Sequence, residues 1–192
     1  MVKKICVIFD AFQNDADGYI PKKCSFFNIS TGAICTYFIE PPFPWEMLHP
    51  SVRDVNSFIG RYILGTSWYS GEISFDRFMM LLFQQADSAE EIYTKGPTCV
   101  RYLSQLLGRI VFDIENIMRE VPAHTVDRLK KDLPKMNCMM MDHKRKNFTP
   151  GFDLPEYSCC QNRAYLYGHV VIYYLEKAKR RENINRGEKQ AI

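Results

Sequence analysis

Several features that mark common protein classes are missing from this 192-residue sequence. No apolar run approaches the ~20 residues that a membrane-spanning helix needs, so we expect no membrane association. No signal peptide is visible, because the first four residues lead directly into a short strand. The seven cysteines form no regular framework, which argues against a disulfide-stabilised secreted scaffold. We therefore expect an intracellular protein of a reducing compartment, the cytoplasm or the nucleus.

A strong net charge is also absent. The formal net charge is only +3, so no overall field marks the chain as a nucleic-acid binder. Basic residues are nevertheless concentrated between positions 128 and 146. The candidates for phosphate contacts in this stretch are Lys130, Lys131, Lys144, Arg145 and Lys146. An ordinary solvated loop is the alternative explanation of the same residues.

The composition is that of a globular domain, with 46% hydrophobic and 14% aromatic residues. A chain of this length can bury one complete core. Three strand-like runs with short connections, residues 4–10, 24–29 and 33–40, predict an antiparallel meander. The Pro-Pro-Phe-Pro-Trp segment at residues 41–45 cannot continue a strand ladder, because proline has no backbone N–H to donate.

Helical periodicity begins after the prolines. Apolar residues recur every three or four positions over residues 52–62, which predicts a helix with an apolar stripe. Ser74 is a suitable N-cap for a second helix. Gly108 is a suitable stop for a third helix that begins near Thr98.

Two short strands and a last helix complete the pattern. The strands are expected at residues 92–94 and 109–114, and Ser158 can cap the last helix. This order predicts an α/β fold in one domain, with a mixed sheet of about five strands flanked by helices, the first three strands being antiparallel. The domain is expected to span residues 1–178, followed by a charged and disordered C-terminal tail at residues 179–192.

The end of the first strand carries Phe-Asp-Ala-Phe at residues 9–12. In 3′–5′ exonucleases of the ribonuclease-H-like fold, a first strand of this kind ends in Asp-x-Glu, whose carboxylates hold a catalytic metal ion. Asp10 is present here, but Phe12 stands at the position of the Glu. An apolar ring cannot coordinate a hard dication, which takes oxygen ligands. The strand therefore resembles that of a nuclease in which one metal ligand has been lost.

Taken with the order of the elements, this strand makes the chain similar to the ribonuclease-H-like (DEDD) 3′–5′ exonucleases. The chain also resembles a set of uncharacterised insect proteins that have the Pro-Pro-Phe-Pro-Trp segment after the third strand. Those proteins share a Gly-x-x-Trp-x-x-Gly-x-Ile run, here residues 65–73, and an Ile-Tyr-x-Lys-Gly strand, here residues 92–96. The resemblance covers about residues 4–175 and implies a single ribonuclease-H-like domain.

The two other exonuclease motifs are also altered. The second, normally Asn-Ala-x-Phe-Asp-x-x-Phe-Leu, resembles residues 95–103, with Cys99 at the position of the Asp. The third, normally His-x-Ala-Leu-x-Asp-Ala, resembles the run that begins at Asn162, which takes the position of the general base. Tyr167 then takes the position of the last Asp, and Asp10 is the only retained position. Two dications about 4 Å apart cannot be held by one carboxylate, so the resemblance implies a catalytically degenerate domain.

The alternative is an active metal-dependent exonuclease with a rearranged site, which would use Mg²⁺ or Mn²⁺. Asp113 and Asp153 are further carboxylates, and His169 lies on the last helix. A histidine on a helix is more often a structural residue than a base, so the degenerate domain is the leading interpretation.

A zinc site is a separate hypothesis. Cys138, His143, Cys159 and Cys160 are close in sequence, and thiolate and imidazole ligands suit Zn²⁺. The set resembles the Glu-Cys-His-Cys zinc site of the Maelstrom domain, a ribonuclease-H-like domain that lacks the exonuclease carboxylates, and that likeness adds Glu115. The alternative is that the cysteines pack beneath the last helix while His143 is solvated.

These observations leave two classes of binding partner open. The first is nucleic acid, with RNA favoured, bound by the basic residues and by bases stacked on Tyr165 or Tyr173. The second is a protein that docks on the segment at residues 41–45. The oligomeric state is not predicted by any feature of the sequence.

Overall fold

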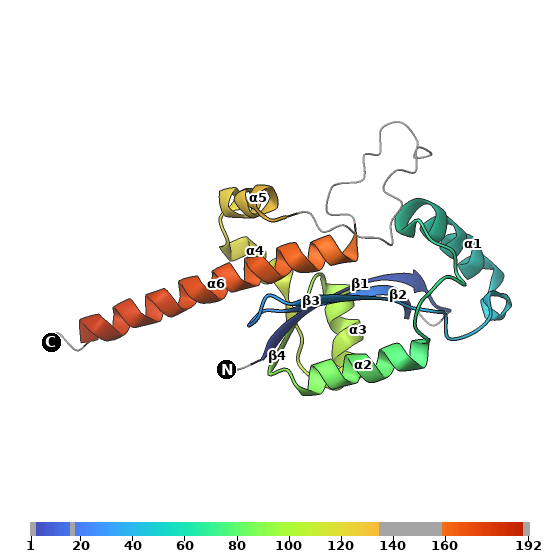
Figure 1. Ribbon diagram of the computed structural model, residues 1–192, viewed down its shortest axis with the longest axis horizontal. Helices are drawn as coiled ribbons and strands as arrows, with labels where there is room; N and C mark the ends of the chain where they lie inside the picture. The colour runs from blue at the N-terminus through green and yellow to red at the C-terminus, as the bar shows by residue number, and fades with distance from the viewer. Residues whose placement is uncertain (1–2, 16–17, 135–158, 190–192) are drawn as a thin grey trace.

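The computed structural model describes residues 3–15, 18–134 and 159–189. Its centre is a five-stranded sheet with the strand order β3-β2-β1-β4-β5 (Figure 1). The first three strands pair antiparallel, whereas β4 pairs parallel with β1 and β5 parallel with β4. The predicted mixed sheet of five strands is therefore confirmed. The strands are β1 (Lys4–Gln13), β2 (Tyr19–Asn28), β3 (Ile34–Phe38), β4 (Glu91–Thr94) and β5 (Phe112–Asp113).

A bulge distorts the pairing of the two longest strands at the place where the first exonuclease motif lies. Asp10 pairs with Lys23, but Ala11 pairs with Pro21, so Lys22 is an extra residue on β2. Side chains at this end of the sheet are therefore turned relative to those before the bulge.

Local sequence explains most helix ends. Ser74 caps α2 by accepting a hydrogen bond from the backbone N–H of Arg77, as predicted. Gly108 ends α3 in the left-handed conformation, with a φ of 62°, also as predicted. The strand expected at residues 109–114 is only two residues long, because Asp113 caps the following helix instead. The helices are η1 (Trp45–Met47), α1 (Pro50–Phe58), the π-helix η2 (Ile59–Leu64), α2 (Phe75–Asp87), α3 (Pro97–Leu107), α4 (Ile114–Glu120), α5 (Ala123–Asp132) and α6 (Cys160–Lys189).

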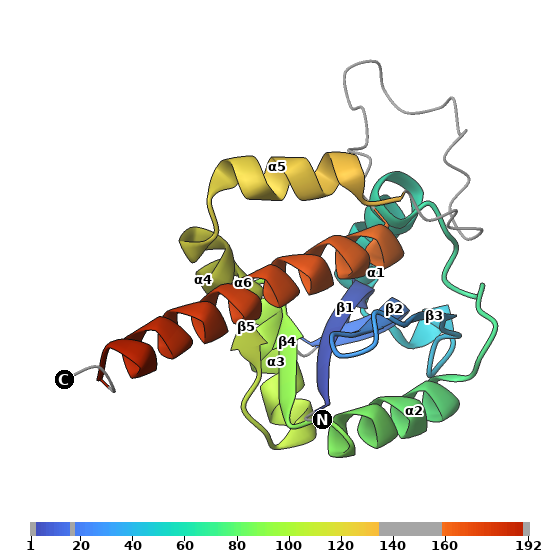
Figure 2. The ribbon, with the colours of Figure 1, turned by 60° about the vertical axis from the view of Figure 1, so that its left-hand side comes forward.

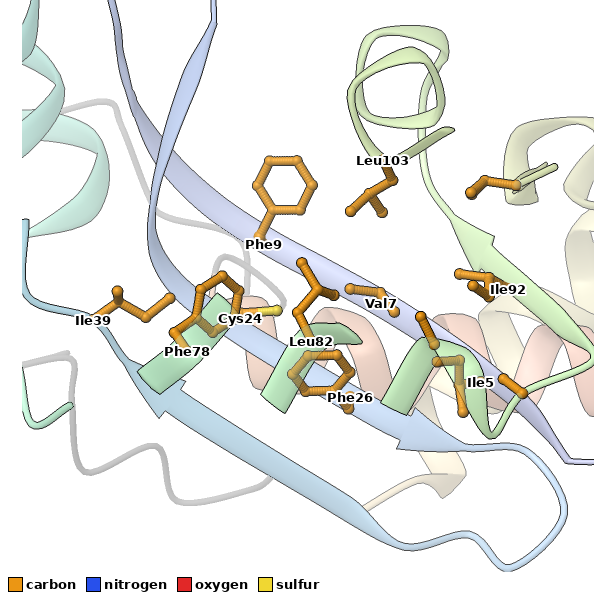
Figure 3. Close-up of a cluster of buried hydrophobic side chains, with 13 residues drawn as sticks. Ile5, Val7, Phe9, Cys24, Phe26, Ile39, Phe78, Leu82, Ile92 and Leu103 are labelled. Atoms are coloured by element: carbon orange, nitrogen blue, oxygen red, sulfur yellow. The ribbon is translucent and has the colours of Figure 1, made fainter. Parts of the chain in front are cut away.

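Helices cover both faces of the sheet. On one face α2 and α3 bury a large cluster that includes Val7, Phe26 and Leu82 (Figure 3). On the other face α4, α5 and α6 bury a second cluster around Phe27 and Val170, and Figure 2 shows α6 crossing this face. A third, smaller cluster lies at the end of β1 and contains Phe12, Ile20, Leu48, Leu64 and Trp68.

The 30-residue helix α6 lies very close to the sheet. A Cβ atom added at Gly168 would come within 2.0 Å of Cδ1 of Phe27, so only glycine permits this approach. The sequence predicts disorder from residue 179, but α6 continues to Lys189 (Figure 1). Lysine, arginine and glutamate are good helix formers, which explains the continuation. Residues 179–184 of this extension are exposed.

The apolar stripe of residues 52–62 forms the predicted helix, α1 and η2, but it does not all face the core. Val52 and Ile59 pack against the third cluster. Val55, Phe58 and Tyr62 are 43%, 57% and 36% exposed. In the described part of the chain, no helix is both long and apolar enough to cross a membrane.

Candidate functional site

Asp10 forms an ion pair with Arg163, which lies in the first turn of α6. The two side chains are 14% and 27% exposed, so the pair is partly shielded from water. Burial alone would lower the pKa of Arg163, but the carboxylate of Asp10, together with Cys160 and Tyr167, acts in the opposite direction, and the pKa is raised. Arg163 therefore stays charged and neutralises the one carboxylate that the first motif retains.

Phe12 lies two positions after Asp10 on β1 and belongs to the third cluster. Its side chain is 1% exposed, and its ring packs against Trp68 with the centroids 5.3 Å apart. The position of the missing Glu is thus filled by a core residue, which explains why this position can be apolar in a stable fold.

A small cavity of about 180 Å³ lies beside the Asp10–Arg163 pair. Residues from the second and third motifs line it, namely Cys99 on α3 and Arg163 and Tyr167 on α6. Burial raises the pKa of the Cys99 thiol, and the nearby charge of Arg163 acts in the opposite direction. The structure therefore brings the aligned motif positions together. Asn162, aligned with the general base, is only 6% exposed and does not line the cavity.

Glu115 and Lys95 also line this cavity. The Nζ atom of Lys95 lies 3.9 Å from Oε1 of Glu115 and 5.3 Å from the ring centroid of Tyr167. The charged groups around the cavity are consequently paired with one another, cation to carboxylate.

Comparisons with known proteins support the fold. No protein-family model matches the sequence, and no curated protein matches it. A crystal structure of a full-length 3′-exonuclease matches with a TM-score of 0.50 and 9% identity, over 92% of this chain and 82% of that one. The chain has an exonuclease-like fold. The nuclease domain of 3′hExo, a DEDDh family member bound to rAMP, matches with a TM-score of 0.45 and 11% identity, over 91% of this chain and 92% of that one. The resemblances to the insect proteins and to the Maelstrom domain stay predictions.

The resemblance stated from the sequence implies two divalent metal ions if the domain is active, and the residues at the site do not fit two such ions. The carboxylate of Asp10 is paired with the guanidinium of Arg163, and the carboxylate of Glu115 is paired with the ammonium group of Lys95. At the two positions that the resemblance aligns with Asp residues, Cys99 offers a thiol whose pKa burial raises and Tyr167 offers a phenol ring. Among the described residues, no three His, Cys, Asp or Glu side chains are placed to hold a metal ion.

Two members of the alternative set of catalytic residues, Asp113 and His169, are among the described residues, and both have structural contacts. Asp113 is used as a cap, since it accepts hydrogen bonds from the backbone N–H groups of Gly96 and Glu115 at 3.0 and 2.9 Å. His169 packs against the rings of Phe27 and Tyr165. Asp153, the third member, lies outside the described residues.

Two of the candidate zinc ligands, Cys138 and His143, lie outside the described residues. Cys159 and Cys160 are both 1% exposed at the start of α6. Sγ of Cys160 lies 3.0 Å from Oγ of Ser25. Glu115 lines the small cavity described above. Zinc binding therefore stays a prediction.

The basic residues are likewise described only in part. Lys130 and Lys131 are exposed in the last turn of α5. Lys130 lies 3.4 Å from Asp127, three residues earlier on the same helix. Lys144, Arg145 and Lys146 lie outside the described residues, and their role in binding stays a prediction.

Near the site, Arg163 and the buried lysine pair of β2 were not predicted. Arg163 occupies an unconstrained position of the third motif, so the motif gave no reason to single it out. Lys22 and Lys23 are both buried, at 1% and 2% exposed. Two consecutive lysines within an otherwise apolar strand were the available signal for buried polar contacts.

Proposed function

We propose that this chain is a catalytically inactive exonuclease-like domain that binds single-stranded nucleic acid, with RNA favoured. The Asp10–Arg163 ion pair carries the proposal. A nuclease of this fold class needs carboxylates free to hold dications, whereas here a fixed side-chain cation neutralises the retained carboxylate. The buried ring of Phe12 adds to this argument, because it leaves no oxygen ligand at the neighbouring position.

Nucleic acid is proposed as the partner because of the fold and the basic residues. Lys130 and Lys131 supply exposed cations on α5, and the sequence adds Lys144, Arg145 and Lys146. Contacts to phosphates release counterions, so affinity should fall by roughly 0.7 log units per log unit of salt for each phosphate neutralised on a single strand. Binding of this kind is expected to be sequence-tolerant.

The test combines cleavage and binding on the same labelled single-stranded RNA. We expect no release of mononucleotides in Mg²⁺ or Mn²⁺, and salt-dependent binding measured by fluorescence anisotropy. The variant in which Lys144, Arg145 and Lys146 are all replaced by Glu should bind more weakly, with its melting temperature unchanged. Release of mononucleotides in Mn²⁺ that disappears in Asp10→Asn would show an active exonuclease with a rearranged site.

Stabilisation by zinc is part of the same proposal. Its candidate ligands are Cys138, His143, Cys159 or Cys160, and Glu115. Because structural zinc binding contributes directly to folding free energy, a strong chelator should lower the melting temperature, and His143→Ala should remove that effect. Metal analysis that finds no zinc in the purified protein, together with a melting temperature insensitive to chelator, would contradict this part.

A further inference from the structure

A second cavity, of about 520 Å³, opens at the end of β1 beside the ring of Phe12. One wall is formed by α1 and η2, and another by the segment that carries Trp68 and Tyr69. Trp68 is 5% exposed and packs between the rings of Phe43 and Trp45, with centroids 5.8 and 5.3 Å away. The aromatic part of the cavity lining is therefore held in place by ring–ring packing.

Buried contacts hold the walls in place. The ammonium group of Lys22 donates to three backbone carbonyls, among them that of Trp68 at 2.6 Å and that of Ser70. Gly60 allows η2 to approach the opposite wall, because a Cβ atom there would lie 2.9 Å from the carbonyl oxygen of Thr66. A cavity with walls fixed in this way is pre-formed, as ligand sites usually are.

The cavity lining combines aromatic rings, small polar side chains and one cation. Trp45, Trp68 and Tyr69 supply aromatic surface, while Ser57 and other small polar side chains supply hydroxyl groups. Arg61 is the one charged side chain among the described lining residues, and no carboxylate is among them. These groups suit a flat, uncharged ring with polar edges that is attached to an anion.

Aromatic rings and a cation also lie on the exposed surface of α1 and η2 next to the cavity. Phe58 and Tyr62 are exposed on α1 and η2 with their ring centroids 5.0 Å apart. The guanidinium of Arg61 lies 5.2 Å from the ring of Tyr62. Exposed rings interleaved with cations are the means by which proteins bind single strands without reading their sequence. Besides this, η2 is a π-helix, a form that occurs frequently at functional sites.

We infer that this cavity binds one nucleobase of a single-stranded nucleic acid, with the adjoining phosphate at Arg61 and the next bases on Tyr62 and Phe58. The inference rests on the proposed function and assigns a base-binding site to it, separate from the basic residues of α5. Proline-rich peptides also bind aromatic-lined grooves. The cation at the mouth and the hydroxyl groups favour the nucleobase, because a proline ring uses neither.

Intrinsic fluorescence gives a direct readout, because the chain has only two tryptophans and both line the cavity. Single-stranded oligoadenylate RNA should quench this fluorescence over the same concentration range in which anisotropy of the labelled RNA rises. Trp45→Leu and Arg61→Gln should each weaken binding, the former by about 5- to 150-fold, the range expected for the loss of one base–aromatic stack. Arg101→Gln is the matched control, since Arg101 is exposed on α3 and does not line the cavity.

The outcomes separate this inference from the proposed function. If the RNA binds with unchanged tryptophan fluorescence, and both variants bind as well as the wild type, the inference is overturned while the proposed function stands. If anisotropy does not rise at all, the proposed function itself fails. Quenching by a polyproline peptide but not by the RNA would overturn the inference in favour of a peptide site. Arg61→Gln alters an exposed side chain, so its result does not depend on the folding of Trp45→Leu.

Discussion

Arg163 and Asp10 are separated by 153 positions in the chain, yet their side chains form an ion pair at the end of β1. The pair is held because α6 starts where β1 ends, so the first turn of the helix faces the carboxylate. A charged pair of this kind is costly to break on one side only, because the remaining charge stays partly buried. The same contact therefore contributes to the docking of α6 and withdraws Asp10 from metal binding.

His169 gives a prediction at the scale of one residue. Its ring packs against Phe27 and Tyr165, and Nε2 is buried with no hydrogen-bond partner among the described residues. Burial lowers the pKa of His169 below 6.5, so the unfolded state binds more protons than the folded state between the two pKa values. The free energy of unfolding should therefore fall as pH decreases through about 6.5, the unfolded value.

Urea denaturation at pH 7.5 and at pH 5.5 measures this effect. The wild type should lose more stability between the two pH values than His169→Phe, which keeps an aromatic ring but does not titrate. His124→Gln is the control, because His124 is exposed on α5. An equal loss in the wild type and in His169→Phe would contradict the prediction.

The residues that sequence reasoning identified correctly are those whose role depends on the nearby chain. Ser74 and Gly108 act on backbone groups within a few positions, and their signals are local. Asp10, Cys99 and Tyr167 were found to lie together, but only through a resemblance that already carries the fold. The ion pair of Arg163 depends on tertiary placement, and no local pattern specifies it.

At the scale of elements, α6 lies so close to β2 in the second core that Gly168 has no room for a side chain. Helices normally favour alanine over glycine by about 1 kcal/mol. At Gly168 the opposite result is expected, because an added methyl group would meet Cδ1 and Cγ of the fully buried Phe27 at 2.0 and 2.7 Å. Gly168→Ala should therefore destabilise the protein by about 1–3 kcal/mol, the usual cost of overpacking.

Chemical denaturation of three variants tests this expectation. Phe27→Leu combined with Gly168→Ala should recover part of the loss, since the smaller side chain makes room for the methyl group. Glu176→Ala, an exposed position on the same helix, controls for helix propensity. A Gly168→Ala variant as stable as the wild type would mean that α6 does not lie this close to β2.

Strands and helices were predicted best where periodicity and caps agree. The meander, α2, α3 and β4 follow this rule. β5 was predicted too long, because the apolar residues at 109–114 resemble a strand while the cap at Asp113 decides where α4 begins. The stripe at residues 52–62 predicted a helix correctly but not its exposure. Periodicity identifies which residues share a face, but not whether that face is covered.

At the scale of the whole molecule, helices on both faces of one sheet account for the stability expected of a single domain (Figures 1 and 2). The antiparallel order of the first three strands follows from their short connections. The parallel placement of β4 and β5 beside β1 requires crossover connections, and the order of the elements predicted only that the sheet would be mixed. Whether the domain ends at residue 178 stays a prediction, because α6 continues beyond that position without a break.

Removal of residues 179–192 tests this boundary. Residues 179–184 are exposed, and the partly buried residues of α6 that pack on the second core extend only to Leu175. The shortened protein should therefore keep its melting temperature within about 3 °C, since a shift of 2–4 °C corresponds to about 1 kcal/mol for a domain of this size. Removal of residues 171–192 is the matched control and should unfold the protein, because it deletes the fully buried Val171. RNA binding by the first truncation should show a smaller salt dependence if Lys179, Arg180 and Arg181 contact phosphates, because each lost contact lowers the slope by about 0.7. A melting temperature that falls by much more than 3 °C would place the end of the domain inside the helical extension, and the extension would then be part of the folded core rather than an appendage to it.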